Sequence, residues 1–125
     1  MAEMRTMTGD REAIFPARKL VARMTARYGS DVSSTAELLT DELVTNAVLH
    51  GGGTFTLVAV VDPVGCRLRV TVFDRGSEVA LVPDHSATLR PGGRGLAVVD
   101  ALATSWGIQP LGEAKSVWFE LLLDG

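Results

Sequence analysis

The spacing of hydrophobic residues changes several times along the chain, and each change falls at a Gly, Pro, Asn or Asp residue. Residues 1–12 are polar, and we expect them to be frayed. Apolar residues then recur at helical spacing over residues 17–27 and again over residues 36–49. The sequence therefore predicts two amphipathic helices, which end at Gly29 and at the glycines 51–53.

A spacing of two follows, which is typical of strands with one buried face. Apolar residues alternate over residues 54–61 and 68–72, and the turn at residues 63–65 predicts an antiparallel hairpin. A short helix is predicted after Gly95, and a closing hairpin over residues 106–123. This order predicts an α+β fold: a two-layer α/β sandwich whose helices cover one face of a mostly antiparallel sheet.

Composition places these elements in a single domain, residues 1–125. The chain is 46% hydrophobic and 22% charged, which excludes a disordered tail, and its length excludes a complete two-domain enzyme. The net charge of -3 does not favour binding to nucleic acid or to an anionic membrane. Cys66 is the single cysteine, and no apolar run approaches the ~20 residues that span a bilayer. We therefore expect a cytoplasmic protein that binds neither nucleic acid nor membrane.

Three polar clusters are candidates for a functional site. Glu42, Asn46 and His50 are spaced by four and share one stripe of the second helix. Asp74-Arg75-Gly76 ends a strand and opens a long irregular segment, of a length that is uncommon without a function. Gly92-Gly93-Arg94-Gly95 precedes a helix, where free backbone N–H groups and the helix dipole favour a phosphate.

Each cluster also has a purely structural explanation. Glu and Asn side chains are commonly solvated at helix edges, Asp-X-Gly is a common turn, and a glycine-rich turn by itself is a weak signal. The third cluster contains no GxxxxGK[ST] sequence and follows no buried parallel strand, so it is neither a P-loop nor a Rossmann fingerprint. If the clusters act together on a nucleotide, they require a different fold.

In their order and spacing, the three clusters resemble the N, G1 and G2 boxes of the GHKL (Bergerat-fold) ATPases. The matching segments are residues 42–50, 74–76 and 92–96, and the resemblance extends from about Ala17 to Leu123. Within this superfamily the chain is most similar to the small anti-sigma-factor serine kinases. The resemblance implies that the ligands are ATP and Mg²⁺.

The resemblance also implies a role for each matching residue. Asn46 would bind the Mg²⁺ that bridges the phosphates, and an amide oxygen is a suitable ligand for that ion. Glu42 would be the catalytic general base, and Asp74 would accept a hydrogen bond from the adenine amino group. The other implied nucleotide-binding positions are Gly76 at the adenine end, Gly93, Gly95, Leu96 and the charged Arg94 beside the phosphates, and Ser116 near the adenine.

The chain departs from the family pattern at several points. Ser77-Glu78 follow Gly76 where the family commonly has another glycine, and residues 4–8 are too polar to predict the family's N-terminal edge strand. His50 either reaches the rim of the pocket or ends its helix as a structural histidine, and the sequence leaves both open. We expect Lys115 to be an ordinary charge of the closing hairpin.

Two functions remain open at this point. The resemblance implies an ATP-dependent protein serine/threonine kinase that phosphorylates an anti-sigma-factor antagonist and sequesters a sigma factor, with Glu42 retained as its base. The alternative is a non-catalytic ATP-dependent regulator, in which bound ATP orders the chain for partner capture. A histidine-kinase catalytic domain is disfavoured, because 125 residues leave no room for a dimerising phospho-acceptor helix pair. A homodimer is possible, since such kinases often pair.

Overall fold

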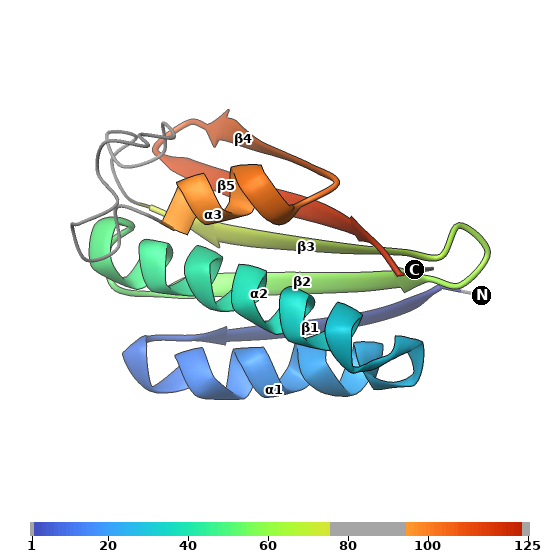
Figure 1. The fold of residues 1–125 in the computed structure, drawn as a ribbon. Helices are drawn as coiled ribbons and strands as arrows, with labels where there is room; N and C mark the ends of the chain where they lie inside the picture. Colours follow the sequence, from blue (N-terminus) through green and yellow to red (C-terminus); the bar gives the residue numbers. More distant parts are fainter. Residues whose placement is uncertain (1, 76–94, 124–125) are drawn as a thin grey trace.

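The computed structural model describes residues 2–75 and 95–123, which form two layers (Figure 1). The first layer is a five-stranded sheet in the order β1-β2-β3-β5-β4, and all neighbouring strands are antiparallel. Helices α1, α2 and α3 cover one face of this sheet. The strands are β1 (Glu3–Gly9), β2 (Phe55–Asp62), β3 (Arg67–Asp74), β4 (Ser105–Leu111) and β5 (Ala114–Leu122). The predicted α+β sandwich with helices on one face is therefore confirmed.

Both long helices begin earlier than the apolar spacing predicts. α1 is Ile14–Thr25, α2 is Ser30–His50 and α3 is Gly95–Leu102; the short 3-10 helices η1 (Arg11–Ala13) and η2 (Ala26–Tyr28) flank α1. Pro16 is accommodated because it lies in the first turn of α1, where backbone N–H groups have no partner within the helix. Gly29, at φ 106, reverses the chain before α2. The first turn of α2 is largely exposed and polar, so hydrophobic spacing could not predict it.

The expectation that residues 1–12 are frayed is wrong. Residues 3–9 form β1, an edge strand that pairs with β2 along its whole length. Met7 lies opposite Leu57 and packs against the core, whereas Thr8 and Thr56 hydroxyls lie 3.1 Å apart on the other face. Because backbone hydrogen bonds hold an edge strand, one hydrophobic side chain packed against the core suffices, and most of the other positions can be exposed.

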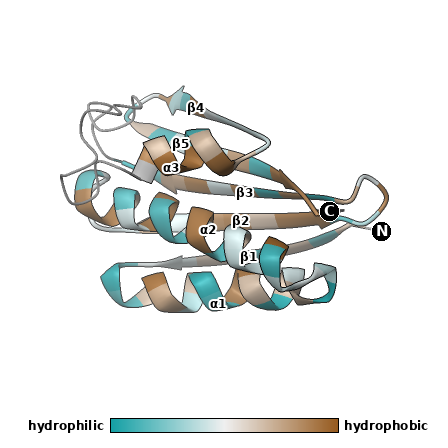
Figure 2. Cartoon of the chain, viewed as in Figure 1, coloured by the Kyte–Doolittle hydropathy of each residue, from teal (hydrophilic) through white to brown (hydrophobic). Residues whose placement is uncertain are grey.

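Alternating side chains from the central strands meet the helices in one hydrophobic core. Figure 2 shows hydrophobic residues along α3 and the central strands, with hydrophilic residues interspersed on α1 and α2. Phe119 of β5 and Leu39 of α2 are both 0% exposed, and burial of a side chain of this kind contributes roughly 1.5–3 kcal/mol. Other core residues are Val21, Leu43, Val44, Leu57, Val61, Leu68, Val70, Val72, Val99 and Val117.

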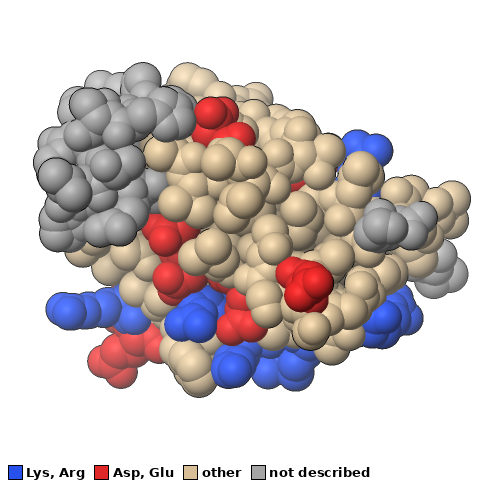
Figure 3. Space-filling model, viewed as in Figure 1, with Lys and Arg blue, Asp and Glu red and all other residues tan. Residues whose placement is uncertain are grey.

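The helical face carries charges of both signs. In Figure 3, Lys and Arg side chains gather where α1 lies in Figure 1, and Asp and Glu side chains lie among them. Arg18 of α1, for example, lies 3.3 Å from Glu37 and 3.9 Å from Asp41, both on α2. Within residues 2–75 and 95–123, no helix combines the length and apolar character needed to cross a membrane.

Candidate functional site

The three residues of the predicted polar stripe of α2 differ in how deeply they are buried. Asn46 is 3% exposed and lies beside the buried Leu43 and Ala47, whereas Glu42 is partly buried and His50 is exposed at the end of the helix. The side-chain oxygen of Asn46, Oδ1, has no hydrogen-bond partner among the described residues. An unsatisfied buried polar atom costs about 1–3 kcal/mol, so the position of this oxygen favours a ligand over a purely structural role.

The carboxylate of Asp74 lies directly against the end of α2. The N–H of Arg75 donates to the carbonyl oxygen of Gly51 at 3.1 Å, which joins the end of β3 to the end of the helix. A Cβ at Gly51 would lie 2.6 Å from Asp74 Oδ2 and 2.6 Å from the carbonyl oxygen of Ala47. A glycine is therefore needed for this approach, and Gly51 itself follows Asn46 by five residues, which corresponds to about 7.5 Å along the helix axis.

Lys115 occupies the position beside Asp74. The two residues are cross-strand partners on β5 and β3, and Lys115 Nζ donates to Asp74 Oδ1. Asp74 is 5% exposed and Lys115 is 3% exposed. The expectation that Lys115 is an ordinary hairpin charge is therefore wrong. Its even spacing from Val117 and Phe119, which both face the core, is the sequence signal that places it there.

Ser116 is not brought to Asp74. It lies opposite Phe73 in the register of β3 and β5, and side chains of adjacent strand residues point to opposite faces of the sheet. Ser116 is buried, but on the face away from the helices. The resemblance placed a hydroxyl near the adenine, and in this structure Lys115 holds the position next to the aspartate instead.

The N-terminal end of α3 lies at the same end of the molecule as the ends of α2 and β3 (Figure 1). Leu96, in the first turn of α3, is 2% exposed, and α3 packs against α2. The first backbone N–H groups of a helix have no partner within it and favour an anion. α3 itself begins at Gly95, whereas Gly76, Gly93 and Arg94 lie outside the described residues.

A magnesium ion at this end would rely on few protein ligands. The described part of the chain contains no group of three or more His, Cys, Asp or Glu side chains that could hold a metal. Mg²⁺ commonly keeps several waters and takes phosphate oxygens together with one or two protein oxygens, so a single amide oxygen from Asn46 fits that chemistry. The magnesium ion would neutralise charge on the phosphates, and Asn46 is the residue that would hold the ion.

A separate cavity lies between α1 and α2. It has a volume of about 280 Å³ and is lined by Arg18, Ser34, Glu37, Leu38 and Asp41. None of the predicted site residues lines it. The cavity is therefore distinct from the cluster formed by Asn46, Asp74 and Lys115.

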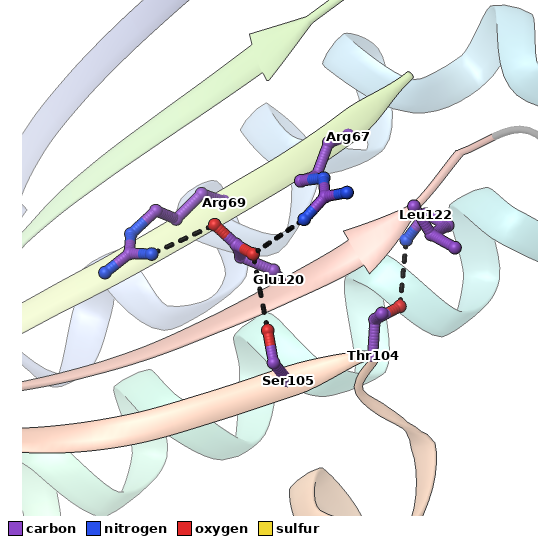
Figure 4. Close-up of polar contacts among 6 residues, drawn as sticks. All are labelled: Arg67, Arg69, Thr104, Ser105, Glu120 and Leu122. Carbon is purple, nitrogen blue, oxygen red and sulfur yellow. Dashed lines mark hydrogen bonds and ion pairs between the residues drawn. The ribbon is translucent and has the colours of Figure 1, made fainter. Parts of the chain in front are cut away.

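The face of the sheet away from the helices carries a polar network that the sequence pattern does not predict (Figure 4). Glu120 accepts hydrogen bonds from Arg69 Nη1 at 2.9 Å, from Arg67 Nη1 at 3.2 Å and from Ser105 Oγ at 3.3 Å. Burial, the largest single influence, raises the pKa of Glu120, but the hydrogen bonds from Arg69, Arg67 and Ser105 and the charge of Arg69 together outweigh it. The pKa of Glu120 is therefore lowered, and the network joins β3, β5 and β4.

Comparison with known proteins identifies the fold. Neither a protein-family model nor a curated protein matches the sequence. The histidine kinase AdeS of Acinetobacter baumannii matches with a TM-score of 0.53 and 13% identity, over 98% of this chain and 70% of that chain. The histidine kinase domain of the blue-light activated histidine kinase of Erythrobacter litoralis EL346 matches with a TM-score of 0.52 and 19% identity, over 88% and 60%. The chain is therefore similar in fold to these histidine kinase structures.

Proposed function

We propose that the chain is an ATP-binding protein kinase domain of the anti-sigma-factor type. The observation that carries this proposal is the unsatisfied, buried Oδ1 of Asn46, at the end of the molecule where Asp74 is buried and α3 begins. Asn46 Oδ1 suits a metal ion, Asp74 suits the adenine base, and the start of α3 suits a phosphate. The fold shared with histidine kinase structures supports the assignment.

In this proposal, each end of the nucleotide meets a different element. Asp74 accepts from the adenine amino group at the end of β3, and the first N–H groups of α3 contact phosphate oxygens. Asn46 Oδ1 would hold Mg²⁺, which would supply charge neutralisation of the phosphates. The residues therefore position the nucleotide, which is the main requirement of phosphoryl transfer.

Glu42 is the proposed general base. It lies one helical turn before Asn46, which corresponds to about 6 Å along the axis of α2, and it is partly buried. Its carboxylate takes the proton from a substrate serine hydroxyl while the serine oxygen forms a bond to the γ-phosphorus. The bond between that phosphorus and the β,γ-bridging oxygen breaks, so ADP leaves and phosphoserine forms.

The protein partners follow from the resemblance and belong to the same proposal. The serine belongs to an anti-sigma-factor antagonist, and a second surface of the domain sequesters a sigma factor. Phosphorylation of the antagonist would release it, because a phosphate adds about 1.5–2 negative charges at a protein interface.

Calorimetric titration with Mg-ATP and Mg-ADP tests the site before any partner is known. We expect Asn46→Ala to weaken binding of the Mg-nucleotide, and Glu42→Gln to preserve it. The matched control is Glu37→Gln, an acid of the same helix that pairs with Arg18 and lies outside the site. If wild-type protein with magnesium binds no ATP, the proposed function is wrong.

Transfer of radiolabelled phosphate to an antagonist protein tests the chemistry. Glu42→Gln should reduce transfer by roughly 10²–10⁴-fold, which is the usual contribution of a general base. Undiminished transfer in this variant would refute the assignment of Glu42. If wild-type protein binds Mg-ATP and captures a sigma factor but labels no antagonist, the non-catalytic regulator is the correct function.

A further inference from the structure

The buried lysine beside Asp74 requires an explanation. Lys115 is one of two lysines in the chain, and it is 3% exposed on the core face of β5. Removal of an ammonium group from water costs several kcal/mol, and well-packed hydrophobic residues often replace a buried ion pair without loss of stability. Structural need alone therefore does not account for a lysine at this position.

The hydrogen-bonding capacity of Lys115 exceeds what the pair uses. An ammonium group has three N–H donors, and one of them is directed at Asp74 Oδ1. Among the described residues, the structure shows no second acceptor for Lys115. A carboxylate accepts several hydrogen bonds, so the pair presents an acceptor and a donor side by side at the end of β3.

This arrangement complements one edge of adenine. The edge carries the N6 amino group, a donor, next to the ring nitrogen N1, an acceptor. We propose that Lys115 is a specificity-determining residue that donates to adenine N1 while Asp74 accepts from the N6 amino group. The inference rests on the proposed ATP site.

The order of the two groups gives the pair its selectivity. The phosphates are held near Asn46 and the start of α3, so the base meets Asp74 and Lys115 in one orientation. Guanine and hypoxanthine carry an acceptor, O6, in place of the amino group and a donor, N1–H, in place of the acceptor. Both contacts would then be mismatched, and sites that hydrogen-bond a polar group reject analogues that leave buried groups unpaired.

Nucleotide analogues test the inference with the wild-type protein. Calorimetric titrations would compare Mg-ATP with 1-deaza-ATP, in which a C–H group replaces N1, and with inosine triphosphate. A hydrogen bond from a charged donor contributes about 1.5–3 kcal/mol, which corresponds to roughly 10–150-fold in affinity. We expect 1-deaza-ATP to bind more weakly than ATP by a factor in this range, and inosine triphosphate to bind more weakly still.

Substitution of Lys115 removes that discrimination. In Lys115→Met, ATP and 1-deaza-ATP should bind with equal affinity, because the donor that distinguishes them is gone. A lysine that only supports the fold would change both affinities together and leave their ratio intact. Lys19→Met is the matched control: Lys19 is the other lysine and is exposed on α1, so this variant should keep the wild-type ratio.

Lys115→Met removes the ammonium group that pairs with Asp74 and risks misfolding, so Asp74→Asn with Lys115→Met is the second variant. This double variant removes both charges and should also fail to discriminate 1-deaza-ATP from ATP. If wild-type protein binds ATP and 1-deaza-ATP equally well, or if Lys115→Met keeps the wild-type ratio, the role of Lys115 is wrong and the ATP site stands. If wild-type protein binds no ATP at all, the proposed function fails and this inference fails with it.

Discussion

The contact between the end of α2 and Asp74 can be tested by Gly51→Ala. Gly51 has φ -114 and ψ 27, a region open to alanine, so the substitution carries no left-handed backbone penalty. The new Cβ would lie 2.6 Å from Asp74 Oδ2 and from the Ala47 carbonyl oxygen, well inside the ~3.5 Å of an ordinary contact. The Ala47 carbonyl accepts the Gly51 N–H at 2.7 Å and cannot move away without loss of that bond. Asp74 must therefore shift.

Overpacking of this kind costs about 1–3 kcal/mol. For a domain of this size we take about 3–5 °C in melting temperature per kcal/mol, so Gly51→Ala should melt roughly 3–15 °C below the wild type. Mg-ATP affinity, measured by calorimetry, should fall at least about tenfold, because a hydrogen bond to a charged group contributes about 1.5–3 kcal/mol and Asp74 is displaced.

Gly53→Ala is the control for this prediction. Gly53 has φ 91, and a Cβ there would meet nothing within 4 Å. This variant should lose about 1–2 kcal/mol through left-handed strain and keep its affinity for Mg-ATP. A Gly51→Ala protein as stable as the wild type would refute the close contact, and an unchanged affinity would refute the role of Asp74 in nucleotide binding.

Two further predictions concern the sheet face away from the helices. The pKa of Glu120 is lowered in the folded state, so its stabilisation is present above the unfolded pKa and is lost as pH falls through the folded value. Glu120→Gln should therefore cost about 1 kcal/mol at pH 7 in urea unfolding, and the difference from wild type should vanish in acid; a constant difference would contradict this. A Cβ at Gly107 would lie 2.8 Å from Trp118 Nε1. The guanidinium carbon of Arg69 lies 3.9 Å from the centroid of the same ring. Gly107→Ala should therefore lower the free energy of unfolding by about 1–3 kcal/mol and alter indole fluorescence. Unchanged fluorescence would show that the ring does not rest on this glycine.

Most of the fold could be predicted from periodicity. The strands β2, β3 and β5 alternate because one face is buried against the helices, and this signal is strong wherever burial is one-sided. β1 was missed because it is an edge strand with mostly exposed side chains, and its pairing with β2 depends on backbone hydrogen bonds. Backbone hydrogen bonds leave no pattern in the sequence.

The sequence could predict which site residues share a face only where those residues lie on the same helix or strand. Spacing placed Glu42 and Asn46 on one stripe, but the burial of Asn46 depends on how α2 packs against its neighbours. Whether Lys115 or Ser116 lies beside Asp74 depends on the register of β3 with β5. A shift of one residue in that register would move every side chain to the opposite face of the sheet. β3 and β5 are distant in sequence, so neither the residue types nor the family resemblance that suggested Ser116 could show that Lys115 pairs with Asp74.

Two buried side-chain oxygens of α2, one on Thr40 and one on Asn46, allow a test of whether an unsatisfied group serves a ligand. Thr40 Oγ1 and Asn46 Oδ1 both lack a hydrogen-bond partner within the described residues, and each should cost about 1–3 kcal/mol in the nucleotide-free protein. Thr40→Val and Asn46→Leu should therefore both raise the free energy of unfolding by about 1 kcal/mol, since each replaces the polar group with an apolar one of similar size. Only Asn46→Leu should abolish magnesium-dependent nucleotide binding, because residues kept for a ligand commonly reduce the stability of the protein without it. If Asn46→Leu instead unfolds at lower urea than the wild type while Thr40→Val does not, then Oδ1 is satisfied within the protein and the argument for a metal at Asn46 is lost.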